Sequence, residues 1–128
     1  MIKQPFRAEI HPSSVHEGWE ANPEKSVQID LHGEINAFAD SALAAAYAEA
    51  DKQEPDNIVL NFNDVDYINS TGIALIVGML AQARKAHRRL SVFGLSNHYL
   101  EIFHITRLSD FMEIYPDSAS ALKGKVTS

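Results

Sequence analysis

Asn69, Ser70, Thr71 and Gly72 are the residues whose types and spacing are best suited to chemistry in this sequence. They stand between a run typical of a buried strand and a long apolar run typical of a helix. A hydroxyl at a helix start can accept hydrogen bonds from backbone N–H groups that have no partner inside the helix. The same N–H groups and the helix dipole also favour a phosphate. Ser70 is therefore a helix cap or a phosphoacceptor, and its position alone favours the cap.

Other kinds of site find little support in the sequence. A serine nucleophile in a G-x-S-x-G elbow needs glycine where Ile68 stands, and no evident His or acid completes a triad. The phosphate-binding glycine motifs of the P-loop and dinucleotide types are absent. The 6 histidines show no metal-ligand spacing, and there is no cysteine for a thiolate site. We expect no enzymatic activity, no metal and no cofactor.

Length and composition bound the remaining possibilities. A chain of 128 residues fits one domain, so we treat residues 1–128 as a single unit. The formal net charge of −6, without a block of basic residues, argues against nucleic acid as a partner and suits a protein partner. No apolar run is long enough to span a membrane, and the lack of cysteine fits a reducing compartment. We therefore expect a cytoplasmic protein, and its oligomeric state stays open.

The apolar pattern predicts the elements that hold the turn. Helical spacing covers residues from about Phe38 to Lys52, from Ser70 onward and from His98 to about Ile105, with Asn97 as a cap and a weak helix from Asp117 to Lys123. Strand patterns cover residues 6–10, 26–32, 57–62, 90–95 and 111–116. Gly33 and Glu34 are expected to end the regular part of the second strand. Residues 11–25 are expected to form a loop or long hairpin, in which Trp19 covers an edge of the core or anchors a partner.

Two helical stripes are expected to face inward. The first combines Ile73, Ile76, Val77, Leu80 and Ala83, and the second combines Tyr99, Ile102 and Phe103. The order of strands and helices is typical of a mostly parallel sheet with crossover helices. In such a sheet the turns at the carboxyl ends of the strands form the functional edge. We therefore expect the turn at 69–72 to lie on the same edge as the turn at 33–37.

Three segments resemble a known family. They are "GEIN" at 33–36, "NIVLNFNDVDYINSTGIALIVGML" at 57–80 and "LSVFGLSNHYLEIFHITRL" at 90–108. Together they resemble the STAS domain of anti-sigma factor antagonists over about residues 26–115, and "DVDYINSTGI" is the most specific part. The resemblance implies one STAS-like α/β domain with a core at about 26–123. We expect a four-to-five-stranded mixed sheet with about four packed helices.

The resemblance also implies a regulatory module without catalysis of its own. In the family, the serine matching Ser70 is phosphorylated with ATP by a partner that is both a serine kinase of the ATP-binding, histidine-kinase-like fold and an anti-sigma factor. The unmodified form binds that partner and frees the sigma factor, whereas the phosphorylated form does not until a phosphatase restores it. Added charge at a packed interface would explain the release by repulsion and desolvation.

Several neighbours are expected to shape the site of Ser70. They are Asn69, Thr71, Gly72 and Asn36, and two of them depart from the family, which usually has Asp where this chain has Asn69 and Asn36. Loss of the two carboxylates could slow phosphorylation. Alternatively, it could make a phosphate on Ser70 more favourable, because fewer negative charges of the protein repel it. Thr71 is more readily a capping partner than a second acceptor. Arg107 stands where the family often has Gly after Thr106, at an expected helix end.

The partner surface and the function leave alternatives open. Ile35, Phe38 and Ile73 are candidates for its apolar part, although burial under the first helix explains Ile35 and Phe38 about equally well. The leading function is an anti-sigma factor antagonist switched at Ser70. A STAS scaffold or a subunit of a transport or signalling complex, not controlled by phosphorylation, is the first rival. A domain that binds a nucleotide or a lipid in a groove beside the turn is the second.

Overall fold

The computed structural model of the chain describes residues 6–11, 14–15 and 25–116. Its sheet contains β1 (Arg7–Ile10), β3 (Lys25–Ile35), β4 (Asn57–Ile68), β5 (Arg89–Phe93) and β6 (Glu113–Tyr115), in that spatial order, and the short β2 (Ser14–Val15) also pairs with β3. Strands β1 and β2 run antiparallel to β3, whereas β3, β4, β5 and β6 are parallel to their neighbours. The sheet is therefore mixed, as the sequence predicts.

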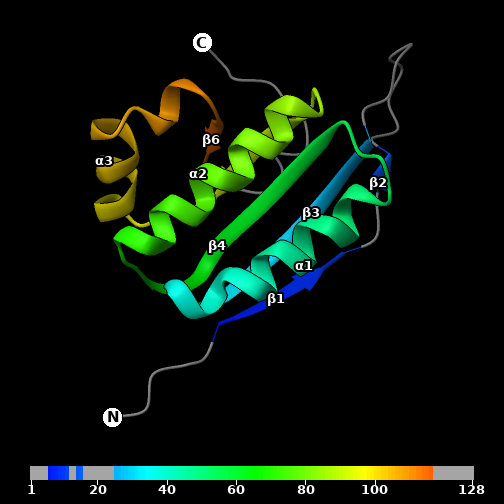
Figure 1. Cartoon of the computed structure of the whole chain (residues 1–128). Helices are drawn as coiled ribbons and strands as arrows, with labels where there is room; N and C mark the ends of the chain where they lie inside the picture. The colour runs from blue at the N-terminus through cyan, green and yellow to red at the C-terminus, as the bar shows by residue number, and fades with distance from the viewer. Residues whose placement is uncertain (1–5, 12–13, 16–24, 117–128) are drawn as a thin grey trace.

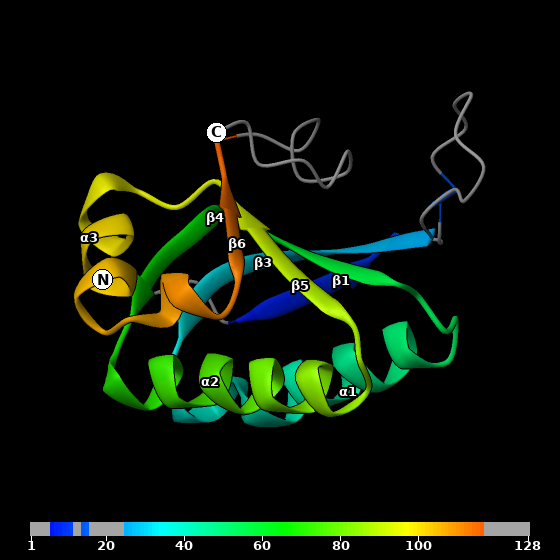
Figure 2. The same ribbon diagram turned by 90° about the horizontal axis from the view of Figure 1, so that it is seen from above.

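In the part of the chain that the structure describes, three α-helices pack against this sheet. They are α1 (Asp40–Asp51), α2 (Ser70–Lys85) and α3 (Asn97–Ile105), and short 3₁₀ turns, η1 (Ala37–Ala39) and η2 (Leu108–Asp110), precede α1 and follow α3. Helices α1 and α2 lie side by side on one face of the sheet, and α3 lies near the start of α2 (Figures 1 and 2). The expected fourth helix at 117–123 lies outside the described residues, as does Trp19.

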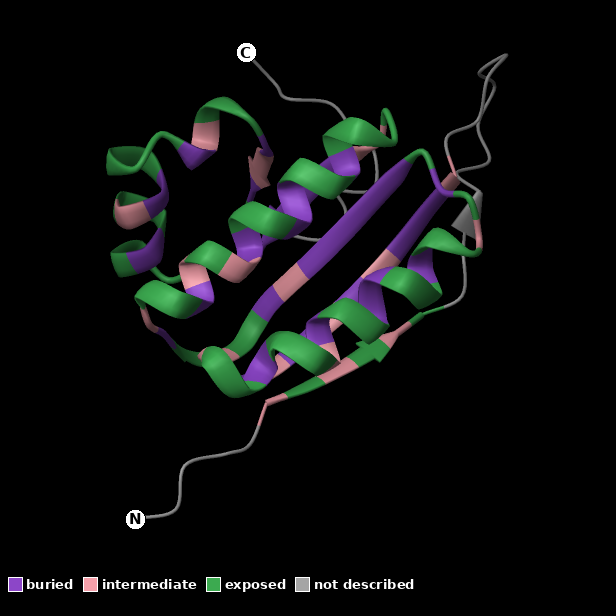
Figure 3. Ribbon diagram, in the orientation of Figure 1, coloured by how far each residue is buried: buried purple, intermediate pink, exposed green. Residues whose placement is uncertain are grey.

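The alternation along β3 decides which face carries the core. Val27, Ile29 and Leu31 are fully buried, whereas Gln28 and Asp30 on the other face are half-buried. Because successive side chains of a strand point to opposite faces, this period of two places one apolar face under the helices. In Figure 3 the sides of α1 and α2 that face the sheet are buried and their outer sides are exposed. The core thus lies between the sheet and these helices.

Strands β3 and β4 both extend beyond their predicted ends. Strand β3 continues to Ile35, but its regular pairing with β4 is interrupted around Gly33 and Glu34, where the sequence predicts that the regular part ends. The β3–β4 register shifts on either side of His32 and Gly33, and Gly33 has a φ of 90°, a conformation that glycine adopts without steric cost. Strand β4 continues to Ile68, pairing with β3 alone after it has left β5. These extensions bring the ends of β3 and β4 to one edge.

Two helix details also differ from the predictions. Ser96, not Asn97, caps α3, since its side chain accepts a hydrogen bond from the Tyr99 N–H. Val77 is 42% exposed, whereas Met79 takes a buried place on α2. The expected inward face of α3 is confirmed, with Tyr99 and Phe103 buried. Among the described residues, no helix is long and apolar enough to cross a membrane.

Candidate functional site

Ser70 is the first residue of α2, and its side chain is exposed. The residue before it, Asn69, is the N-cap, with an extended backbone and an Oδ1 atom that accepts a hydrogen bond from the Gly72 N–H at 2.8 Å. Asparagine is among the preferred cap residues because its side-chain oxygen satisfies an otherwise unpaired N–H. The capping role that position alone favoured for Ser70 is therefore filled by Asn69, and the Ser70 hydroxyl is left accessible.

Gly72 allows the start of α2 to lie directly against the end of β3. A Cβ atom built at Gly72 would lie 2.1 Å from the carbonyl oxygen of Ile35, which is closer than atoms can approach. That same carbonyl accepts a hydrogen bond from the Asn69 N–H at 3.2 Å. Only a residue without a side chain fits here, so Gly72 fixes how the two turns meet. The expectation that these turns share one edge of the sheet is confirmed.

Asn36 holds the neighbouring turn in a similar way. Its Oδ1 atom accepts a hydrogen bond from the Phe38 N–H at 2.9 Å, so Asn36 caps η1. Its Nδ2 atom donates to the Glu34 carboxylate at 2.9 Å, a bond that an aspartate could not make without a proton. Asn36 and Asn69, at the two positions where the resemblance implies Asp, thus each supply a capping oxygen without a negative charge.

The three residues expected to contact a partner differ in their exposure to solvent. Phe38 is 93% exposed on η1, which packs against α2. Ile73 is half-buried on the first turn of α2 and touches the core. Ile35 is fully buried, so its side chain offers nothing to a partner, and the alternative explanation of burial holds for it. Exposed aromatic side chains are common anchors of protein interfaces.

Tyr99 supports the site from α3, a role that the sequence did not reveal. Its hydroxyl accepts a hydrogen bond from the Ile68 N–H at 2.8 Å, just before the Asn69 cap. The ring is buried, so the hydroxyl must find a partner within the protein. A tyrosine on the inward stripe of the third helix was the available signal, but the stripe does not tell which backbone group it meets.

The shifted pKa values belong to groups on the strands outside this turn. Burial favours the neutral form of Asp30, but hydrogen bonds from His11, Gln28 and Asn61 outweigh it and lower the pKa of this carboxyl group. Burial, together with its hydrogen bond to Glu113, raises the pKa of Tyr115 to about 12. Asp30 links β3 to β4, whereas the hydrogen bond of Tyr115 to Glu113 lies within β6. The role of both groups is structural.

The described contacts around Ser70 bear on the chemistry of the turn. Within the described residues, the Ser70 hydroxyl has no hydrogen bond to a histidine or a carboxylate that would activate it as a nucleophile. No group of His, Cys, Asp or Glu in the described segments could hold a metal ion. The first turn of α2 contains no acidic residue, so the positive end of the helix dipole is not neutralised there. This environment favours a negative group on Ser70.

Comparisons with known proteins agree with this fold. The family model described as "Mlab, STAS domain" matches residues 20–116. An anti-sigma-B factor antagonist of Listeria monocytogenes is 32% identical over 88 residues, which cover 69% of this chain and 77% of the relative. The crystal structure of an anti-sigma factor antagonist from Mycobacterium paratuberculosis has a TM-score of 0.67 at 19% identity and covers 91% of this chain and 93% of its own.

A further solved structure shares the fold in a modified state. It is the Bacillus cell fate determinant SpoIIAA in its phosphorylated form, with a TM-score of 0.60, 19% identity, and coverage of 89% of this chain and all of its own. At this identity the likeness concerns the fold alone. The arrangement of strands and helices around the turn is therefore one that a phosphorylated protein also uses.

Proposed function

This chain belongs to the STAS domain family of anti-sigma factor antagonists, and on that premise we propose that it is a partner switch controlled by phosphorylation of Ser70. The unmodified form binds an anti-sigma factor and thereby releases a sigma factor. The anti-sigma factor is also the serine kinase, of the ATP-binding histidine-kinase-like fold, and a phosphatase reverses the modification. The protein itself is a regulator without catalysis.

The exposed hydroxyl of Ser70 at the start of α2 carries this proposal. A kinase can reach it, and the phosphate would meet backbone N–H groups of the first helical turn that have no carbonyl four residues before them. The fold of the free protein therefore tolerates the modification. The docking surface would not tolerate the modification, because the phosphate adds up to two negative charges beside Phe38 and Ile73. The phosphate also resists the loss of its hydration on binding.

The neutral amides at positions 69 and 36 shape this switch. Asn69 and Asn36 keep the caps while removing two negative charges from the neighbourhood of the phosphate. We propose that they lower the electrostatic cost of phosphorylation at Ser70, since like charges would otherwise repel at short range. Thr71 lies exposed beside Ser70 and serves as a neighbour within the docking surface rather than as the acceptor.

Phosphosite mapping tests the proposal. The purified chain is incubated with ATP and its cognate anti-sigma factor, and the modified residue is located by mass spectrometry. We expect a single phosphate on Ser70, none on the Ser70→Ala variant, and an unchanged site in Thr71→Ala. An unmodified wild type that still binds the anti-sigma factor would instead favour a scaffold without a phosphorylation switch.

A further inference from the structure

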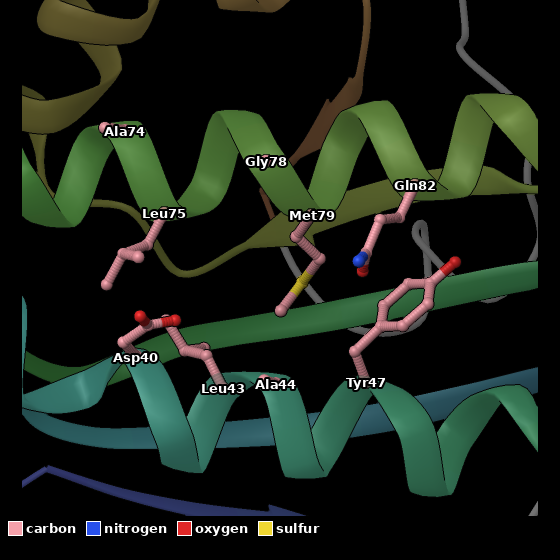
Figure 4. Close-up of a pocket in the computed structure, with 9 residues that line it drawn as sticks. All are labelled: Asp40, Leu43, Ala44, Tyr47, Ala74, Leu75, Gly78, Met79 and Gln82. Carbon is pink, nitrogen blue, oxygen red and sulfur yellow. The ribbon is translucent and has the colours of Figure 1, made fainter.

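A groove separates α1 and α2 on the outer side of the helical layer (Figure 4). It has a volume of about 190 Å³ and a mostly apolar lining, with Leu43 on α1 and Leu75 and Met79 on α2. Small residues, Ala44 and Gly78, keep it open from either side. Pockets for cofactors and drug-sized ligands usually measure about 300 to 1,000 Å³. This groove instead has room for one large side chain.

Tyr47 carries a polar group that the free protein does not use. Its ring lines the groove and reaches from α1 toward α2, beside Gln82 (Figure 4). The residue is only 8% exposed, and its buried hydroxyl has no hydrogen-bond partner within the described residues. An unsatisfied buried hydroxyl costs about 1 to 3 kcal/mol. The neighbouring Gln82 is exposed, so an occupant of the groove that displaces its side chain could supply the missing partner.

The groove also continues the candidate docking surface. Asp40 lines it at the start of α1, directly after η1, and Ala74 lines it one turn beyond Ser70 on α2. A protein that covers Phe38 and Ser70 would therefore reach the groove within the same interface. Interface anchors are commonly Tyr or Trp side chains that fill a pocket near the centre of the contact.

Resting on the proposed function, we propose that this groove receives one anchor side chain of the anti-sigma factor, aromatic with a polar tip. The apolar body packs against Leu75 and Met79, and the polar tip hydrogen-bonds to the Tyr47 hydroxyl. Binding therefore needs two separate contacts, one at Ser70 that phosphorylation controls and one in the groove that it does not.

Gly78 offers a way to close the groove without disturbing the fold. A Cβ atom built there meets no atom within 4 Å, and a larger side chain would project into the open space. Since glycine is unfavourable inside a helix, Gly78→Leu should keep or raise the melting temperature. Ala81→Leu adds the same side chain to an exposed position of α2 that does not line the groove, so it is the matched control.

The first measurement needs no partner. p-Cresol, the analogue of a tyrosine side chain, is titrated into the ¹⁵N-labelled protein at millimolar concentration and followed by amide chemical shifts. We expect saturable shifts around Ala44 and Gly78 in the wild type and in Ala81→Leu, and their loss in Gly78→Leu. If the wild type shows no shifts there, or if native mass spectrometry finds a copurified small molecule that Gly78→Leu lacks, the inference is overturned.

The second measurement is the affinity for the cognate anti-sigma factor by calorimetry. Gly78→Leu should weaken binding at least tenfold, whereas Ala81→Leu should bind as the wild type does. Tyr47→Phe should weaken binding about fivefold while the free protein becomes no less stable, because the hydroxyl has a hydrogen-bond partner only in the complex.

Full affinity of Gly78→Leu for the anti-sigma factor overturns the inference and leaves the Ser70 switch intact. Failure of the wild type to bind any anti-sigma factor contradicts the proposed function, and the p-cresol titration still judges the groove.

Discussion

The Asn69 side chain both starts α2 and leaves Ser70 accessible. Its cap hydrogen bond to Gly72 is short and well formed at 2.8 Å, and the loss of such a cap costs about 0.5 to 2 kcal/mol. We expect Asn69→Ala to lower the free energy of unfolding by about 1 kcal/mol. Asn69→Asp should match or exceed the stability of the wild type, because a carboxylate still caps the helix and also interacts favourably with the helix dipole.

Urea denaturation at neutral pH measures this pair of variants. We expect the urea concentration at the midpoint of unfolding to be lower for Asn69→Ala than for the wild type. For Asn69→Asp it should equal or exceed the wild-type value. An alanine variant as stable as the wild type would mean that Asn69 does not cap the helix. In that event the conclusion that Ser70 is free from a capping role would lose its basis.

Local chemistry made the position of Ser70 predictable, but it could not decide the burial of its neighbours. A run of small polar residues before an apolar helical stripe is a local signal, and the helix does begin at Ser70. Whether Ile35 or Phe38 faces solvent depends on how η1 lies against α2, which is a tertiary matter. Likewise, the contact of Tyr99 with Ile68 joins residues 31 positions apart, and no local pattern encodes it.

The contact between the end of β3 and the start of α2 depends on Gly72. Gly72→Ala would place a methyl group 2.1 Å from the Ile35 carbonyl, so the helix must move away from the strand or the variant must lose stability. We expect a loss of about 2 kcal/mol or more, in the range of overpacked cores. Gly78→Ala in the same helix meets open space and should gain up to about 1 kcal/mol.

Thermal denaturation of these two glycine variants separates helix propensity from the close approach. Propensity alone would raise the melting temperature of both. A lowered value for Gly72→Ala beside a raised one for Gly78→Ala identifies the approach to Ile35 as the cause. Equal stabilisation of the two would show that β3 and α2 do not meet as described.

A strained residue lies between α3 and η2. Arg107 has a φ of 66°, a left-handed conformation that costs a residue with a Cβ atom about 1 to 2 kcal/mol. Its ion pair with Asp110 is exposed and offsets little of that cost. Arg107→Gly should therefore stabilise the protein by about 0.5 to 1 kcal/mol, whereas Arg107→Ala, which keeps the strain, should not. Chemical denaturation of the two variants checks this, and a destabilised glycine variant would contradict it.

Element types were predictable from periodicity, whereas two element lengths were not. The alternation of β3 and the apolar run of β4 identify both as strands. Asp64 and Asp66, near the end of β4, have no strong strand preference and lie in the strand because β3 and β4 pair there across a bulge. Such pairing brings together distant segments and lies beyond a local pattern.

On the face of the sheet opposite α1 and α2, the hydrogen bonds of Asp30 link β3 to the segments on either side of it. They connect this residue of β3 with His11, next to β1, and with Asn61 of β4. Because the pKa of Asp30 is lowered in the folded protein, the folded state binds fewer protons than the unfolded state. The stabilising contribution is complete above the ordinary pKa of about 3.9 and is lost as the pH falls through the folded value.

Stability measured at pH 6 and pH 3 tests this linkage. We expect Asp30→Asn to lose less free energy of unfolding between the two values than the wild type does. Asn57→Ala, which removes a buried amide from the Ser26 and Ser91 contacts, is a control that should lower stability at both values alike. An identical pH dependence in Asp30→Asn and the wild type would show that Asp30 plays no part in acid sensitivity.

The affinity of the anti-sigma factor for the two forms of this protein tests the switch most directly. The unmodified chain and the chain stoichiometrically phosphorylated on Ser70 are titrated separately into the anti-sigma factor by calorimetry. We predict that the phosphorylated form binds at least about 10-fold more weakly, a difference of about 1.4 kcal/mol, while its melting temperature is unchanged or raised. Equal affinity of the two forms would contradict the account, because charge on Ser70 would then not decide which protein docks.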